Sequence, residues 1–356
     1  MKRKVLILSI LPIGLSLFGC NKNSQPEKDY FQNWNKRDNS ALNTLVNYVK
    51  DVTNEKSSNF IPKADRIATF DMDGTFVGEL YPTYFEYNML VYRAIVDPGY
   101  KDKAPEFVVD AAKAIIDKVT KGTSLPSDFD LIHAEAAAEA YSGMTVKQFA
   151  EYTRSYAQNT PFGFTGMTYA TSFYKPMLEV FDYLQDNGFK TYVVSGSDRY
   201  LCRTLVENLN IPSNQIIGMD VELKASKQGD EDGRTYTMGS DETLVRTNNL
   251  LIKNLKTNKC KAIEKEIGKI PVLSFGNSDG DCAMHNYCKS NEKYKTEVFM
   301  VLADDYDDDY PSRKKTRDRE IEWRENNYNI FSMHDDFKTI YGENVHKTEM
   351  TYYSYE

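Results

Sequence analysis

The chain has 356 residues, 41% of them hydrophobic, which is enough for one large α/β domain with an insertion or for two domains. Its formal net charge of -8 argues against nucleic acid as a general partner. No internal repeat of roughly 20 to 50 residues runs through the chain, which argues against a solenoid or a propeller.

The N-terminal segment, residues 1–20, has the pattern of a targeting signal. A basic start, Lys2-Arg3-Lys4, precedes an apolar run that is too short to span a bilayer comfortably. The run ends in Leu17-Phe18-Gly19-Cys20, which resembles the lipobox of bacterial lipoproteins. This resemblance implies lipidation of Cys20, a membrane anchor, and a place in the bacterial cell envelope, in the outer membrane or facing the periplasm. The alternative is a plain signal peptide with an incidental cysteine. Polar residues 21–38 are predicted to form a tether.

Four further cysteines lie downstream, and their spacing fits no zinc motif. An exported chain can pair such residues as disulfides, while buried free thiols are the alternative. The residues concerned are Cys202, Cys260, Cys282 and Cys288.

The first predicted elements are a helix capped by Ser40 and a buried strand, Ile67–Phe70. About a hundred residues of mostly helical pattern follow the strand. The predicted helical segments are Leu80–Val96, Phe107–Val119, Leu131–Tyr141 and Val146–Gln158.

An alternation of helices and strands then begins, which predicts a mostly parallel sheet covered by helices on both faces. The predicted strands are Lys190–Val194, Gln215–Gly218, Val272–Phe275 and Val298–Leu302, with a hairpin of Val221–Leu223 and Thr235–Met238. The predicted helices are Met177–Asn187, Arg199–Leu209, Lys261–Ile267 and Asp281–Cys288.

These elements predict a two-part core that is interrupted by a helical insertion after its first strand. The core comprises residues 39–77 and 171–345, and the inserted cap comprises residues 78–170. Residues 346–356 form a C-terminal tail.

The strand Ile67–Phe70 runs directly into Asp71-Met72-Asp73-Gly74-Thr75. The carboxyl ends of parallel strands are where open α/β folds place their chemistry. Two carboxylates, Asp71 and Asp73, are therefore expected at that edge of the sheet.

Three more polar groups follow other predicted elements. Ser195 and Gly196 come after a strand and before a helix, where a hydroxyl and backbone N–H groups form an anion site. Lys259 begins a helix, with Lys261 as the alternative. Asn277 and Asp281 place amide and carboxylate oxygens in one turn, as a hard cation requires.

Together these groups suit phosphoryl transfer. A carboxylate that attacks a phosphate dianion needs positive charge and hydrogen-bond donors to offset the repulsion. Asp71 is the expected nucleophile, forming an aspartyl-phosphate, and Lys259 the expected charge partner. Asp73 is the expected acid and base, which protonates the leaving oxygen and then activates water.

These four motifs, in this order, resemble the haloacid dehalogenase (HAD) superfamily over roughly residues 67–302. The resemblance implies a Rossmann-like sheet with a C1-type helical cap, as in the phosphoserine-phosphatase-like branch. It also implies a Mg²⁺-dependent phosphatase that acts on a small phosphorylated metabolite. Its metal ligands correspond to Asp71, Asp73 through its carbonyl, Asn277 and Asp281, and its phosphate-binding residues to Thr75, Ser195, Gly196 and Lys259. Asn277 stands where the phosphatase pattern usually has Asp.

Other activities stay open. A phosphotransferase or mutase would pass the phosphoryl group to an alcohol, and a lipoprotein disabled at Asn277 would bind a phosphorylated ligand without turnover. Gly276–Gly280 also matches the nucleophile elbow of serine hydrolases, with Ser278 as nucleophile and His334 or His346 as base. The elbow is disfavoured because Asp279 would place a carboxylate beside the developing oxyanion.

Only the segment that follows the first motif gives information about the substrate. Tyr81, Tyr84 and Tyr87 can form an aromatic cage for a quaternary ammonium, as in phosphocholine, or can pack inside the cap. Glu79 lies one residue short of the place where phosphoserine phosphatases carry a substrate-reading Glu.

Overall fold

The computed structural model describes residues 28–35, 37–38, 40–78 and 82–355. The targeting segment, Cys20, Glu79 and Tyr81 lie outside these residues, so the lipid anchor stays a prediction. Within the described ranges, no helix is both long enough and apolar enough to cross a membrane.

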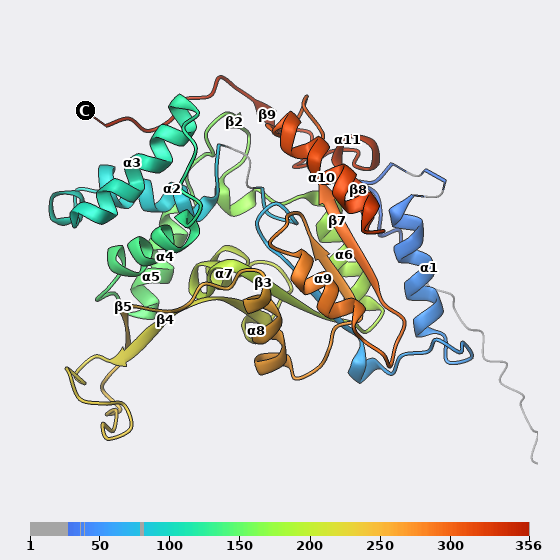
Figure 1. Ribbon diagram of the computed structural model, residues 1–356, viewed down its shortest axis with the longest axis horizontal. Coiled ribbons are helices and arrows are strands. Elements are labelled where there is room, and N and C mark those ends of the chain that lie inside the picture. Colours follow the sequence, from blue (N-terminus) through green and yellow to red (C-terminus); the bar gives the residue numbers. More distant parts are fainter. Residues whose placement is uncertain (1–27, 36, 39, 79–81, 356) are drawn as a thin grey trace, which may run out of the picture.

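A seven-stranded sheet forms the centre of the molecule, with the strand order β5-β4-β3-β1-β6-β7-β8 (Figure 1). All neighbouring strands are parallel except β4 and β5, so the predicted mostly parallel sheet is confirmed. The strands are β1 Ile67–Phe70, β3 Lys190–Asp198, β4 Ile216–Ala225, β5 Leu244–Ile252, β6 Leu273–Gly276, β7 Glu297–Leu302 and β8 Asn329–Ser332.

Helices cover both faces of this sheet, which is the Rossmann-like α/β arrangement. Alternate residues of a strand point to opposite faces. Val193 accordingly joins the core cluster that contains α1 (Ala41–Thr53) and α6 (Lys175–Asp186). Val194 joins a cluster with Ile263 and Met284 on the other face. The helices on that second face are α8 Thr257–Ile267, α9 Cys282–Lys289 and α10 Arg313–Glu325.

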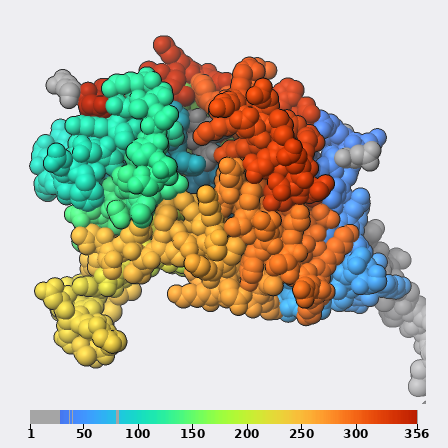
Figure 2. Space-filling view, in the orientation of Figure 1, coloured from blue at the N-terminus to red at the C-terminus, as the bar shows by residue number. Residues whose placement is uncertain are grey.

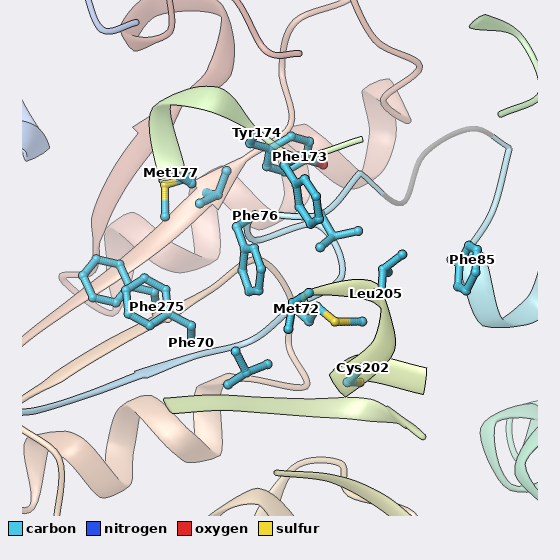
Figure 3. Close-up of a cluster of buried hydrophobic side chains, with 14 of the residues drawn as sticks. Phe70, Met72, Phe76, Phe85, Phe173, Tyr174, Met177, Cys202, Leu205 and Phe275 are labelled. Atoms are coloured by element: carbon cyan, nitrogen blue, oxygen red, sulfur yellow. The ribbon is translucent and has the colours of Figure 1, made fainter. Parts of the chain in front are cut away.

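A row of stacked aromatic rings crosses the sheet and holds β1 in place. Phe70 stacks on Phe275 of β6 at a centroid distance of 4.2 Å (Figure 3). It also stacks on Phe181 of α6 at a centroid distance of 4.0 Å. Phe299 and Phe331 continue the row into β7 and β8. Each such pair stabilises the fold by about 0.5–1.5 kcal/mol beyond burial. The row thereby fixes the strand end that carries Asp71.

Between β1 and α6 the described part of the chain forms four α-helices, as the sequence predicted, and they occupy the left of Figure 1. Their boundaries agree with the prediction to within a few residues, except that the first helix starts later and ends in a π-helical turn, Tyr92–Val96. They are α2 Phe85–Val91, α3 Glu106–Lys121, α4 Phe129–Ala140 and α5 Val146–Tyr156.

The second strand of the hairpin was predicted wrongly. It is β5, Leu244–Ile252, and not Thr235–Met238. The N–H groups of Thr235 and Tyr236 instead close a turn on the carbonyl of Asp232, within a connection that projects from the body (yellow in Figure 2). β5 pairs with β4, and in it the side chain of Arg246, 1% exposed, is buried 2.7 Å from Asp198 Oδ2.

The C-terminal segment returns from the core to the helical insertion. His346–Lys347 (β9) pairs with Phe164–Thr165 (β2), and the chain then runs along the insertion towards α3 (Figure 1). The Tyr352 hydroxyl donates to Asn88 Oδ1 of α2 at 2.8 Å, and the Tyr355 hydroxyl donates to Asp117 Oδ1 of α3 at 2.7 Å. The segment predicted as a tail therefore fastens the insertion to the core.

Candidate active site

A cavity of about 180 Å³ lies at the carboxyl edge of the sheet. The ends of β1, β3 and β6, the segment before α8, and the helices α2 and α4 of the insertion all contribute to its wall. Of the predicted site residues, it brings together Asp71, Asp73, Gly196, Lys259, Asn277 and Asp281. Thr75 and Ser195 are fully buried behind this wall.

Lys259 forms the floor of the cavity. Its Nζ lies 2.5 Å from Asp71 Oδ1 and 2.6 Å from Asp281 Oδ1, and its side chain is only 1% exposed. Lys261, the alternative, lies at the surface and donates to Asn258. The structure therefore places Lys259, and not Lys261, between the two acids.

The pKa values of the two carboxyl groups that share this lysine are shifted in opposite directions. Burial and the nearby charge of Asp281 raise the pKa of Asp71 to about 7. Burial also opposes the charge on Asp281, but the Lys259 ammonium overcomes it and holds the pKa of Asp281 below its usual value. One acid of the pair is therefore held ionised, while the charge on the other depends on its surroundings.

Asp281 also organises the turn that follows β6. Its Oδ2 accepts the N–H groups of Asn277 and Ser278, at 3.0 and 3.1 Å, and the Ser278 hydroxyl at 3.1 Å. A Cβ on Gly276 would lie 2.5 Å from Asp281 Cβ, so only glycine fits there. The Ser278 hydroxyl is thus bonded to a carboxylate, while His334 lies at the surface beside Asp335, which further disfavours the serine-hydrolase alternative.

Asp73 is paired with a serine that the sequence analysis missed. The Ser197 hydroxyl donates to Asp73 Oδ2 at 2.8 Å, and burial raises the pKa of Asp73 despite this bond. Gly196 and Ser197 line the cavity, whereas Ser195 accepts the N–H of Ser197 from behind. β3 continues to Asp198 instead of ending at Val194, so the strand ends four residues further along than predicted. The sequence feature that could have indicated Ser197 was the presence of a second serine two positions after Ser195.

Glu86 and Lys253 are further cavity residues that the sequence analysis missed. Glu86, on α2, accepts the N–H of Asp198 at 2.9 Å and lies 3.9 Å from Lys253 Nζ. Burial raises the pKa of Glu86 to about 7, although Lys253 opposes the shift. His133 Nδ1, on α4, lies 3.8 Å from the same carboxylate. The only signal in the sequence was a lone acid inside an aromatic helix.

Two of the three predicted cage tyrosines line the cavity. Tyr84 and Tyr87 meet edge to face at 5.0 Å, and the Tyr87 hydroxyl donates to Asp130. Lys118 Nζ lies 5.9 Å from the Tyr84 ring and 5.8 Å from the Tyr87 ring. A cation of the chain itself therefore already lies beside both rings, which favours packing over an ammonium cage.

The oxygen donors at the cavity suit Mg²⁺. In the described part of the chain, no group of three or more Asp, Glu, His or Cys side chains is placed so that it could hold a metal ion by itself. Asp71 and Asp281 supply carboxylates, and Asn277, 4% exposed, supplies an amide at the same edge. Mg²⁺ is usually held by one or two carboxylates together with waters and a substrate phosphate, so this donor set fits it.

The four downstream cysteines are free thiols, of which Cys202 and Cys288 are buried and Cys260 and Cys282 are half-buried, so the alternative of buried free thiols holds for two of the four.

No family model and no curated protein matches the chain. Solved structures do match. A conserved protein of unknown function from Anaerococcus prevotii has a TM-score of 0.51 and 14% identity, over 86% of this chain and 94% of that one. Cytosolic 5'-nucleotidase IIIB bound to cytidine has a TM-score of 0.49 and 12% identity, over 88% of this chain and 90% of that one. A phosphoserine phosphohydrolase-like protein from Francisella tularensis has a TM-score of 0.36 and 17% identity, over 67% of this chain and 87% of that one. At these identities the first likeness shows a shared fold, and hydrolases occur among the matched structures.

Proposed function

We propose that the chain is a HAD-type phosphatase that hydrolyses a small phosphomonoester through an aspartyl-phosphate. The observation that carries this proposal is the pair of acids after β1, with Asp71 held 2.5 Å from Lys259 and Asp73 bonded to Ser197. One acid lies beside a fixed positive charge, and the other is a buried group with a raised pKa, which suits a proton donor. The four motifs that resemble the HAD superfamily support the same assignment.

In the first step a carboxylate oxygen of Asp71 bonds to phosphorus while the bond to the leaving oxygen breaks, and Asp73 gives that oxygen its proton. In the second step Asp73 takes a proton from water as the water oxygen bonds to phosphorus. This releases inorganic phosphate and restores the Asp71 carboxylate. Lys259 and the N–H groups around Gly196 stabilise the charge on the phosphoryl oxygens.

Asp71, Asp281 and Asn277 would hold Mg²⁺, with the backbone carbonyl of Asp73 as a further ligand by the resemblance. When bound, the ion supplies positive charge that reduces the repulsion between the nucleophile and the phosphate dianion. Asn277 brings one negative charge fewer than Asp, so weaker Mg²⁺ binding is expected than in a site with three acids.

The size of the cavity, about 180 Å³, and the helices that roof it favour a small soluble substrate over a protein or a nucleic acid. The same intermediate can pass its phosphoryl group to an alcohol, so phosphotransferase or mutase activity is the nearest alternative.

The test is phosphate release by the purified full chain from a panel of phosphomonoesters, with and without Mg²⁺. We expect metal-dependent release that falls to the buffer background in Asp71→Asn and persists in Asp279→Asn, a matched change at an exposed acid. Binding of phosphoesters without any release would instead indicate a binding protein. Turnover that survives Asp71→Asn but is lost in Ser278→Ala would overturn the mechanism in favour of a serine hydrolase.

A further inference from the structure

Lys256 has a backbone conformation that is rare for a lysine. Its φ is 51° and its ψ is -125°, outside the left-handed helical region and in a region that glycine adopts without strain. Asn327 is the other non-glycine residue with positive φ in the described ranges, and asparagine tolerates that sign far better. Strained residues of this kind concentrate at functional sites, where the surrounding structure holds them.

The segment around Lys256 is fastened to the turn that follows β3. Asn254, fully buried, donates from Nδ2 to the carbonyl of Ser195 at 2.9 Å. The side chain of Leu255 packs against Gly196, where an added Cβ would lie 2.6 Å from Leu255 Cδ2. The carbonyl of Lys256 accepts the N–H of Lys259 at 3.0 Å. These contacts set the position of Lys256 relative to both the phosphate-side turn and the floor of the cavity.

Three lysines at intervals of three residues line the cavity, and two of them have acidic partners. Lys259 bridges Asp71 and Asp281, and Lys253 lies 3.9 Å from Glu86. Lys256 lies at the exposed rim, and its side chain makes no hydrogen bond or ion pair with any residue that the structure describes. The strained backbone thus holds, at the rim of the cavity, a lysine that has no acidic partner among the described residues.

We infer that Lys256 is a specificity-determining residue that binds a second anionic group on the substrate, a carboxylate or a second phosphate. The inference rests on the proposed phosphatase function. The phosphoryl group under attack must lie beside Asp71 at the floor, where Lys259 already supplies the positive charge. The rim lysine is left for a group at the other end of a short substrate. A lysine is a flexible point charge, suited to an anion of either geometry.

The test compares three small esters of matched length: ethyl phosphate, phosphoglycolate and ethylene glycol bisphosphate. The wild-type chain should prefer one of the two with a second anion, and the preferred one identifies that anion as carboxylate or phosphate. In Lys256→Ala the ratio of kcat/KM for that ester over ethyl phosphate should fall about tenfold or more, mainly through KM, as expected for a lost charged hydrogen bond. An unchanged ratio would overturn the inference.

Lys256→Gly separates charge from strain. It should lose the same discrimination while its melting temperature rises, because glycine adopts this backbone without strain. Asn327→Gly relaxes the other positive-φ residue, outside the cavity wall, and should leave the discrimination ratio unchanged. Loss of discrimination in Asn327→Gly as well would refute a local role for Lys256.

Calorimetric titration of Asp71→Asn with the same three esters keeps the two proposals apart. If the wild-type chain releases no phosphate, the phosphatase proposal fails. Tighter binding of a doubly anionic ester, lost on adding Lys256→Ala, would still support the rim site. Equal binding of all three esters would reject it.

Discussion

Replacing Lys259 by methionine should destabilise the protein strongly in the absence of metal. Methionine keeps most of the length of the side chain and removes the ammonium. The change leaves Asp71 and Asp281, whose side chains are 10% and 1% exposed, without the charge that lies 2.5 and 2.6 Å from their oxygens. Removing one member of a buried ion pair typically costs about 3–5 kcal/mol, because the remaining charge stays buried and unpaired.

The loss should depend on pH in a defined direction. Lys259 holds the pKa of Asp281 below its ordinary value, so the wild-type protein gains stability from this group above that value and loses it as the pH falls. In Lys259→Met the ammonium no longer opposes the effect of burial, so both carboxyl pKa values should rise, although the hydrogen bonds that Asp281 accepts from Asn277 and Ser278 limit its rise. Protonation of these carboxylates at low pH removes the unpaired charge from the variant. Its loss of unfolding free energy relative to the wild type should therefore be larger near about pH 8 than near about pH 5.

The assay is urea unfolding in EDTA at both pH values, with Lys261→Met as the matched control at an exposed lysine two residues away. Mg²⁺ should recover part of the loss, because a cation at the two carboxylates replaces the missing charge. A deficit below about 1 kcal/mol, or an equal deficit in the control, would refute the buried-pair reasoning.

Three further changes test the contacts between the insertion and the rest of the chain. Burial raises the pKa of Glu86 to about 7 from 4.5, so this group costs the wild-type protein stability as the pH rises through that window, by about 3 kcal/mol in full. The free energy of unfolding of Glu86→Gln should therefore rise relative to that of the wild type between these two pH values, as measured by chemical unfolding. The gain should be smaller than the full value of about 3 kcal/mol because the amide cannot attract Lys253. A stability difference that does not change with pH would contradict the raised pKa of Glu86. Tyr352→Phe leaves Asn88 Oδ1, fully buried, without its donor and should cost about 1–3 kcal/mol, with faster amide exchange in α2. Tyr355→Phe, whose partner Asp117 is partly exposed, should cost less, and the reverse order would argue against the assignment.

Several features could be predicted from the sequence because they depend on local pattern. The strand Ile67–Phe70 is a short apolar run, and the acids that follow it must lie at its carboxyl end wherever the strand sits in the sheet. The helices of the insertion have apolar residues at helical spacing, so their positions were predicted to within a few residues. The same local logic placed Lys259 and Asp281 at the start of two helices.

Other features were decided only by tertiary contacts. Continuation of β3 to Asp198 brought the Ser197 hydroxyl to 2.8 Å from Asp73 Oδ2. Glu86 entered the cavity because α2 packs over the sheet edge, more than a hundred residues from the Asp198 N–H that it accepts. The strained backbone of Lys256 depends on Asn254 and Leu255 reaching the turn after β3. Local pattern determines which residues end a strand or begin a helix. Where a strand stops, and which distant side chains then meet, depends on burial summed over the whole fold, which no short stretch of sequence carries.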